Sequence, residues 1–129
     1  MMTGRKFPKR ERLDSRKQIE MLFGGGGSLS MAAFPLRVVY TIKERARADV
    51  PAQLLVSVSK RHFKHAVDRN RVKRQIREAY RQNKQLLCDA IPETKQVVMA
   101  LMWLADEHYS TQEVEKRVVK LMQRMVEKL

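Results

Sequence analysis

The sequence predicts a single α+β domain in which helices pack against a small mixed or antiparallel sheet. Two stretches alternate in apolar character as strands do, and two others repeat apolar residues at helical spacing. A further stretch, residues 96–102, is a continuous apolar run of strand length. The 129 residues have the length of one domain and contain no internal repeat, so residues 1–129 are predicted to form one unit. The predicted order is helix, strands, helix, strand, helix.

The first predicted helix covers about residues 15–23. Ser15 and Gln18 have the spacing of a capping box, and apolar residues follow at helical positions. Four glycines at 24–27 end this helix, because each glycine costs roughly 1 kcal/mol in a helix relative to alanine.

Residues 1–13 precede this helix and carry five basic residues against one acidic residue. Such a composition predicts a basic arm that is loose when unbound and becomes ordered on a polyanion. A solvated tail without a role is the alternative.

Residues 34–42 and 53–59 predict two strands. The short polar connection at 43–52 favours antiparallel pairing between them. In the first strand, one face carries Leu36, Val38, Tyr40 and Ile42, and the other carries Arg37, Val39 and Thr41.

The C-terminal third predicts a strand followed by a helix. The apolar run at 96–102 is typical of a strand that is buried on both faces. After a loop at 103–109, Ser110 and Glu113 form a second capping box. The stripe that follows, which favours core packing over a partner-binding role, consists of Val114, Val118, Leu121, Met122, Met125 and Leu129.

Residues 60–84 carry most of the charge. Ten basic residues against two acidic ones give this stretch a net charge of +8, out of +13 for the whole chain. From about Ala66 the pattern is helical, with Val72, Ile76 and Ala79 on one side and arginines on the opposite side. Such a helix can anchor by its apolar side and present guanidinium groups, which donate two hydrogen bonds in a plane to phosphate.

The overall composition restricts the class of function. A net charge of +13 and a pI of about 10.4 are typical of a protein with a polyanionic partner, although a membrane surface attracts the same charge. No apolar run approaches the roughly 20 residues of a membrane span. Cys88 is the only cysteine, which excludes an internal disulfide and favours a reducing compartment.

No catalytic or metal-binding pattern stands out. His62 and His65 lie three residues apart without a third ligand nearby, and surface histidines in a basic segment are the simpler interpretation. The glycine run lacks the Lys-Ser/Thr that follows a phosphate-binding loop. We therefore expect no catalytic residue and no cofactor on the protein itself.

Two stretches resemble a known family. Residues 57–61, Ser-Val-Ser-Lys-Arg, and residues 66–80, Ala-Val-Asp-Arg-Asn-Arg-Val-Lys-Arg-Gln-Ile-Arg-Glu-Ala-Tyr, closely resemble the protein subunit of bacterial ribonuclease P. The core of the likeness is the family's long and specific Arg-Asn-Arg pattern, here at residues 69–71. The resemblance extends from about Phe7 to the C-terminal helix and is looser outside residues 55–81.

This resemblance implies an α-β-β-β-α-β-α fold, a two-layer sandwich like that of some ribosomal proteins, with a left-handed βαβ crossover that contains the Arg-Asn-Arg helix. It implies a cytoplasmic ribonucleoprotein endonuclease of tRNA processing, a hydrolase that removes the 5′ leader of precursor tRNA. The catalytic RNA would be the partner, would bind Mg²⁺ and would carry the chemistry. The protein would hold the leader in a cleft between its first helix and its sheet. Neither a membrane nor an obligate protein partner is implied.

The resemblance also implies two sets of site residues. The RNA-binding set is Lys60, Arg61, Lys64, Arg69, Asn70, Arg71, Lys73, Arg74, Arg77 and Arg81. The leader cleft, beside Lys60, is Ile19, Phe23, Val38, Tyr40, Ser57 and Ser59. Aromatic rings beside hydroxyls and cations are typical of sites that hold single strands without strict base readout. Ile19 departs from the pattern, because the family often has an aromatic residue there, and plain core packing is the alternative for Phe23 and Tyr40.

Other functions remain as alternatives. A basic RNA-binding protein of ribosomal type, with no role in tRNA processing, would co-sediment with ribosomal subunits. A nuclease that acts alone would cleave RNA without an added RNA subunit. A DNA-binding role fits the charge, but no recognition-helix motif is present.

Overall fold

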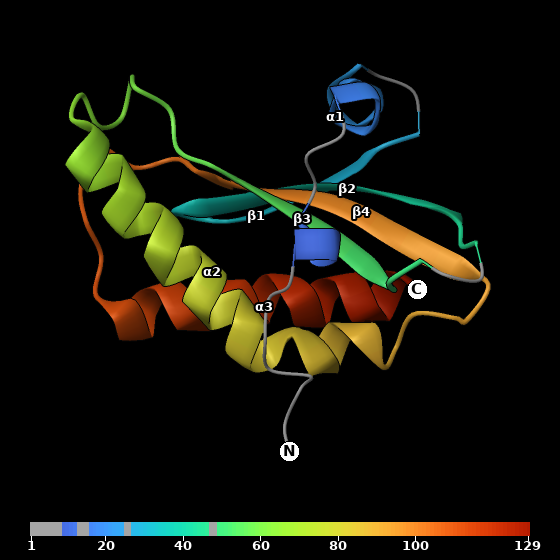
Figure 1. Cartoon of the computed structure of the whole chain (residues 1–129). Helices are drawn as coiled ribbons and strands as arrows, with labels where there is room; N and C mark the ends of the chain where they lie inside the picture. Colours follow the sequence, from blue (N-terminus) through green and yellow to red (C-terminus); the bar gives the residue numbers. More distant parts are fainter. Residues whose placement is uncertain (1–8, 13–15, 25–26, 47–48) are drawn as a thin grey trace.

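The computed structural model describes residues 9–12, 16–24, 27–46 and 49–129. Within these residues, four strands form one mixed sheet in the order β1-β2-β4-β3 (Figure 1). Their bounds are β1 Leu29–Ala33, β2 Leu36–Glu44, β3 Ala52–Ser57 and β4 Lys95–Trp103. β2 pairs antiparallel with β1 and β4, whereas β3 pairs parallel with β4.

The sequence predicted that the strands now seen as β2 and β3 pair antiparallel, and this prediction is wrong. β4 lies between β2 and β3, so those two strands are not neighbours in the sheet. The physical reason is visible in β4, where residues 96–101 are all buried and are therefore covered on both faces. A strand of that composition is most stable at the centre of the sheet.

β1 was not predicted from the residue pattern. Its sequence, Leu-Ser-Met-Ala-Ala, alternates only weakly, and it is an edge strand with exposed residues. With β1 included, three strands precede the central helix, as the resemblance implies. Phe34 and Pro35 form the turn between β1 and β2, so the predicted start of β2 at residue 34 is two residues early.

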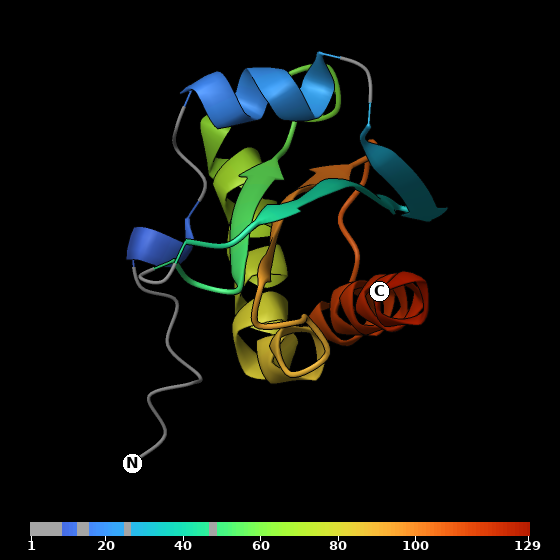
Figure 2. The ribbon, with the colours of Figure 1, turned by 90° about the vertical axis from the view of Figure 1, so that its right-hand side faces the viewer.

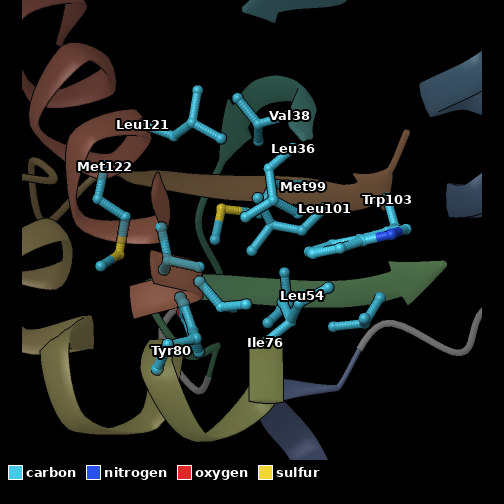
Figure 3. Close-up of a cluster of buried hydrophobic side chains, with 14 of the residues drawn as sticks. Leu36, Val38, Leu54, Ile76, Tyr80, Met99, Leu101, Trp103, Leu121 and Met122 are labelled. Atoms are coloured by element: carbon cyan, nitrogen blue, oxygen red, sulfur yellow. The ribbon is translucent and has the colours of Figure 1, made fainter. Parts of the chain in front are cut away.

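Two long helices cover one face of the sheet and one short helix lies over the other face (Figure 2). The long helices are α2 Ala66–Cys88 and α3 Thr111–Lys128, and the short helix is α1 Arg16–Phe23. The main core lies between the sheet and the long helices and includes Trp103, Tyr80 and Ile76 (Figure 3). α1 contributes Leu22 to a separate small cluster on the opposite face.

Glycines end α1, as the sequence predicts. A Cβ at Gly24 would lie 2.6 Å from the carbonyl oxygen of Glu20, and Gly27 has a φ of +100°, which favours glycine. Residues 25 and 26 lie outside the described residues.

The second capping box and the core stripe of α3 are confirmed. The Ser110 hydroxyl accepts a hydrogen bond from the Glu113 amide. Five apolar residues of the stripe are buried, and Leu129 is partly buried against them. α3 also covers the outer edge of the sheet, because Arg124 donates to the carbonyl of Ala32 in β1. Exposed edge carbonyls of this kind otherwise invite pairing with another chain.

The basic arm is docked over part of its length. Residues Lys9–Glu11 form a 3₁₀ turn, η2, which is the short blue segment beside β3 in Figure 1. Arg12 forms a parallel bridge with Leu54 of β3, and Gln53 donates to the carbonyl of Arg10 at 3.1 Å. The predicted looseness is therefore wrong for residues 9–12, because they cover the second edge of the sheet. Residues 1–8 and 13 lie outside the described residues.

Candidate RNA interface

α2 is anchored by an apolar side. Val72, Ile76 and Ala79 are buried, as the sequence predicts. Tyr80, which borders this side of the helix, is also fully buried. Asn83 lies at the end of this side, and its side-chain amide donates a hydrogen bond to Glu115 of α3 at 2.9 Å. The helix is thereby held against both the sheet and α3, which fixes the direction in which its arginines point.

The basic residues of α2 lie on two flanks of the helix. Arg71 and Arg74 lie on the flank toward α3, where they line a groove of about 410 Å³ with Gln75, Glu78 and Thr111. The side chain of Gln75 is held in this lining because it donates to the carbonyl of Tyr109 and to the Thr111 hydroxyl, at 3.1 and 3.2 Å. The other flank carries three basic residues and one tyrosine, namely Lys73, Arg77, Tyr80 and Lys84. These residues are spaced four, three and four positions apart and therefore share one side of the helix.

Most of the predicted RNA-binding residues are accessible. Lys60, Arg61, Lys64, Asn70, Arg71, Arg74 and Arg77 are exposed, and Lys73 is half-buried. Within the described residues, no hydrogen bond or ion pair engages the guanidinium groups of Arg71 and Arg74. These two arginines are therefore available to an external anion.

Two residues of the predicted set have structural partners instead. Arg69 donates to the carbonyls of Phe63 and Lys64, at 3.0 and 2.9 Å, and so fastens the loop that precedes α2. Arg81 donates to Glu78 at 3.0 Å from its Nε atom. Hydrogen bonds from Arg81 and Gln82 lower the pKa of Glu78, so this carboxylate stays ionised at neutral pH.

Two histidine–aspartate pairs, which the sequence did not predict, join the loop after β4 to the start of α2 and to the loop before it. His62 Nδ1 lies 2.7 Å from Asp106, and His108 Nε2 lies 3.0 Å from Asp68. Phe63 stacks on His108 with 4.5 Å between the ring centroids. His62, expected as a surface histidine in a basic segment, is partly exposed, and its contact with Asp106 helps to place the loop that carries Lys60, Arg61 and Lys64.

A second candidate surface lies on the opposite face of the sheet, around α1. A groove of about 440 Å³ runs between the end of α1, β1 and the sheet. Phe23 at its edge is 47% exposed, so plain core packing does not describe this ring. Arg37 also lines the groove, and its Nε atom donates to the Ser30 hydroxyl at 2.8 Å.

The placement of Val38 and Tyr40 in the leader cleft is wrong. Both side chains have zero exposure and belong to the main core beneath α2 and α3, so the alternative of core packing holds for Tyr40. Because successive side chains of a strand point to opposite faces, Arg37 and Val39 face α1 instead. Tyr40 cannot stack on an RNA base from its buried position.

The remaining predicted cleft residues are compatible with this surface. Ile19 packs against the small cluster under α1, to which Leu55 of β3 also belongs. Ser57 lies two residues beyond Leu55 and therefore on the same face, beside Met102 of β4. Ser59 is exposed, but its hydroxyl accepts a hydrogen bond from the Arg61 amide at 3.0 Å and so shapes the loop.

The described residues hold no cluster of three or more histidine, cysteine, aspartate or glutamate side chains that could share a metal ion. None of their helices is long and apolar enough to cross a membrane.

Comparisons with known proteins agree on one family. The family model for Ribonuclease P matches residues 7–126 of this chain. The ribonuclease P protein component of Porphyromonas gingivalis is 42% identical over 118 residues, which are 91% of this chain and 84% of the relative. The corresponding protein of Chlorobium phaeobacteroides is 41% identical over 87 residues, which are 63% of this chain and 58% of the relative.

Solved structures share the fold. The ribonuclease P protein of Thermotoga maritima matches with a TM-score of 0.63 and 22% identity, over 88% of this chain and 96% of that one. The protein of Staphylococcus aureus matches with a TM-score of 0.65 and 19% identity, over 89% of this chain and 94% of that one. Because the family model spans most of the chain and the identity to the Porphyromonas protein is 42%, this chain belongs to the bacterial family of ribonuclease P protein components.

Proposed function

We propose that this subunit binds the catalytic RNA of ribonuclease P through α2 and the loop before it, and that it holds the 5′ leader of precursor tRNA. The observation that carries the proposal is that Arg71 and Arg74 point outward from a helix whose other side is buried. Phosphate groups on a folded RNA are the ligand that such forks fit. We place the Mg²⁺ ions and the hydrolysis on the RNA.

Reconstitution tests this function. The purified protein, added to the ribonuclease P RNA of the same genome, is expected to stimulate cleavage of precursor tRNA at low magnesium, because its cations replace part of the charge neutralisation that magnesium provides. Cleavage assays with and without the protein measure the effect. An unchanged rate over a range of magnesium concentrations would contradict the proposal. The protein without RNA is expected to leave the precursor intact.

The leader contact is proposed for the groove beside α1. Phe23 offers an exposed ring to the groove that Arg37 also lines, and a stacked base is worth about 1–3 kcal/mol when the ring is removed. Phe23→Ala is therefore expected to weaken binding of precursor tRNA by the holoenzyme about five- to 150-fold, with little change for mature tRNA. Equilibrium binding of both RNAs measures the difference.

Phe34→Ala is the matched control for this prediction. Phe34 is 59% exposed but lies in the turn between β1 and β2, outside the groove. We expect this variant to bind the precursor normally. Equal losses from the two substitutions, or equal losses for precursor and mature tRNA, would exclude Phe23 as a leader contact.

A further inference from the structure

The groove between α2 and α3 has an acidic residue beside its arginines. Its lining consists of Arg71, Arg74, Gln75, Glu78 and Thr111. A carboxylate repels phosphate, so a groove that bound phosphate alone would be weakened by a glutamate in its wall. The volume of about 410 Å³ lies within the range of sites that hold small organic molecules, about 300–1,000 Å³, and is therefore larger than a phosphate group requires.

The carboxylate of Glu78 is held in place and keeps an acceptor position. Its Oε1 atom accepts hydrogen bonds from Gln82 and from Arg81 Nη2, and its Oε2 atom accepts one from Arg81 Nε at 3.0 Å. These bonds use three of the roughly four acceptor positions of a carboxylate. The remaining position is on Oε2, and the side chain is 48% exposed. Glu78 can therefore accept a further hydrogen bond from a ligand.

A hydrogen-bond donor lies in the same lining. The Thr111 hydroxyl accepts a hydrogen bond from the Gln75 amide, which also donates to the carbonyl of Tyr109. A hydroxyl group can donate as well as accept, and within the described residues no acceptor engages the hydrogen of this hydroxyl. The groove thus presents one fixed acceptor and one fixed donor beside two guanidinium groups.

These groups follow one another along the helix. Arg71, Arg74 and Glu78 are spaced three and four residues apart and therefore share one side of α2. Glu78 lies roughly 6 Å beyond Arg74 along the helix axis. The groove is consequently cationic at one end and has an acceptor at the other. A single nucleotide has the complementary order, with an anionic phosphate at one end and the donors of its base edge at the other.

We propose that this groove holds one unpaired nucleotide of the ribonuclease P RNA, with Arg71 and Arg74 on its phosphates and Glu78 accepting a hydrogen bond from an exocyclic amino group of its base. The proposal rests on the proposed function and adds base recognition to it. Proteins read RNA sequence mainly at unpaired bases, through hydrogen bonds to the base edges. Glutamate accepts from base amino groups such as that of cytosine, and uracil has no such group. Glu78 is thereby the specificity-determining residue of the groove.

Deletion of single amino groups from the RNA tests this contact. The ribonuclease P RNA of the same genome is transcribed with sparse, phosphorothioate-tagged purine riboside, inosine or pyrimidin-2-one riboside, which lack the amino groups of adenosine, guanosine and cytidine. RNA bound at limiting protein concentration is separated from unbound RNA. Iodine cleavage then identifies the positions at which a missing amino group weakens binding.

The pattern is compared between the wild-type protein and Glu78→Ala. At one or more positions, deletion of the amino group is expected to weaken binding of the wild-type protein about tenfold, as for one charge-assisted hydrogen bond. The same deletion is expected to weaken binding of Glu78→Ala less than twofold, because the two changes remove one contact. On unmodified RNA, Glu78→Ala is expected to bind about tenfold more weakly than the wild type, although its net charge is higher.

Two variants control for charge and for an effect through Arg81. Glu127→Ala removes the same charge from an exposed position of α3 outside the groove, and we expect it to keep the wild-type pattern and affinity. Arg81→Gln retains the carboxylate of Glu78, so its binding is expected to depend on the same amino group. Circular dichroism verifies that each variant is folded, and the pattern compares positions of the RNA within one protein sample.

Three results would overturn the inference. They are identical patterns for the wild type and Glu78→Ala, tighter binding of Glu78→Ala to unmodified RNA, and loss of the amino-group dependence in Arg81→Gln, which would mean that Glu78 acts only by holding Arg81. If Arg71→Ala/Arg74→Ala still weakens binding in these cases, the proposed function stands. If that double variant leaves the affinity unchanged, the groove is not a contact site and both proposals are refuted.

Discussion

Ile76→Ala is expected to lower the free energy of unfolding by about 2–5 kcal/mol. Ile76 is fully buried in the main core, between α2 and the sheet (Figure 3), and its truncation leaves a cavity there. Domains of this size are stable by only about 5–15 kcal/mol, so the loss is a large fraction of the total. Urea denaturation followed by circular dichroism measures it, as a lower midpoint with an unchanged slope.

The same experiment with Val67→Ala provides the control. Val67 lies on the same helix but is 77% exposed, so its truncation removes almost no buried surface. We expect a change within about 0.5 kcal/mol. Similar destabilisation by both substitutions would mean that α2 is not anchored through the side that carries Ile76.

Arg71→Ala/Arg74→Ala is expected to reduce affinity for the ribonuclease P RNA by about 10²- to 10⁴-fold. Each charge-assisted contact that is removed is worth about 1.5–3 kcal/mol. Both side chains line the groove between α2 and α3, and both are exposed. We therefore expect their removal to leave the free energy of unfolding nearly unchanged. The slope of log affinity against log salt should decrease by about 2, one unit for each lost phosphate contact.

A charge-matched variant, Lys120→Ala/Lys128→Ala, separates specific contacts from general attraction. It removes the same formal charge from exposed positions of α3. We expect its affinity to fall by less than tenfold. Equal losses in the two double variants would show that only the net charge of +13 matters and that the groove beside α2 is not a contact site.

The sequence of β2 did not show which of its two faces lies in the main core. Alternation correctly separated Val38 and Tyr40 from Arg37 and Val39. Both faces of this strand contain apolar residues, so the pattern does not say which face lies beneath α2 and α3 and which lies beneath α1. The placement carried over from the resemblance chose the wrong face for Val38 and Tyr40. The groove beside α1 could be identified only once α1 was known to pack, through Leu22, on the face that carries Val39.

The N-terminal segment shows a second limit. A run of basic residues with a single glutamate predicts a solvated arm, because such residues rarely have buried partners. Lys84, whose ammonium group lies 2.7 Å from the Glu11 carboxylate, is 73 positions later in the chain, and no local pattern connects the two residues. The buried pair exists because β3 and the end of α2 meet at that edge of the sheet, which is a property of the packed molecule.

The sequence by itself determined the helices, three of the four strands and the basic side of α2, because these follow from local periodicity, capping and charge. Only the tertiary structure decided which strands are neighbours, which face of β2 is covered by the long helices, and where the arm is docked. These features depend on contacts between residues far apart in the chain. Their free energy comes from burying whole faces of elements against one another, and such burial leaves no mark in a short window of sequence.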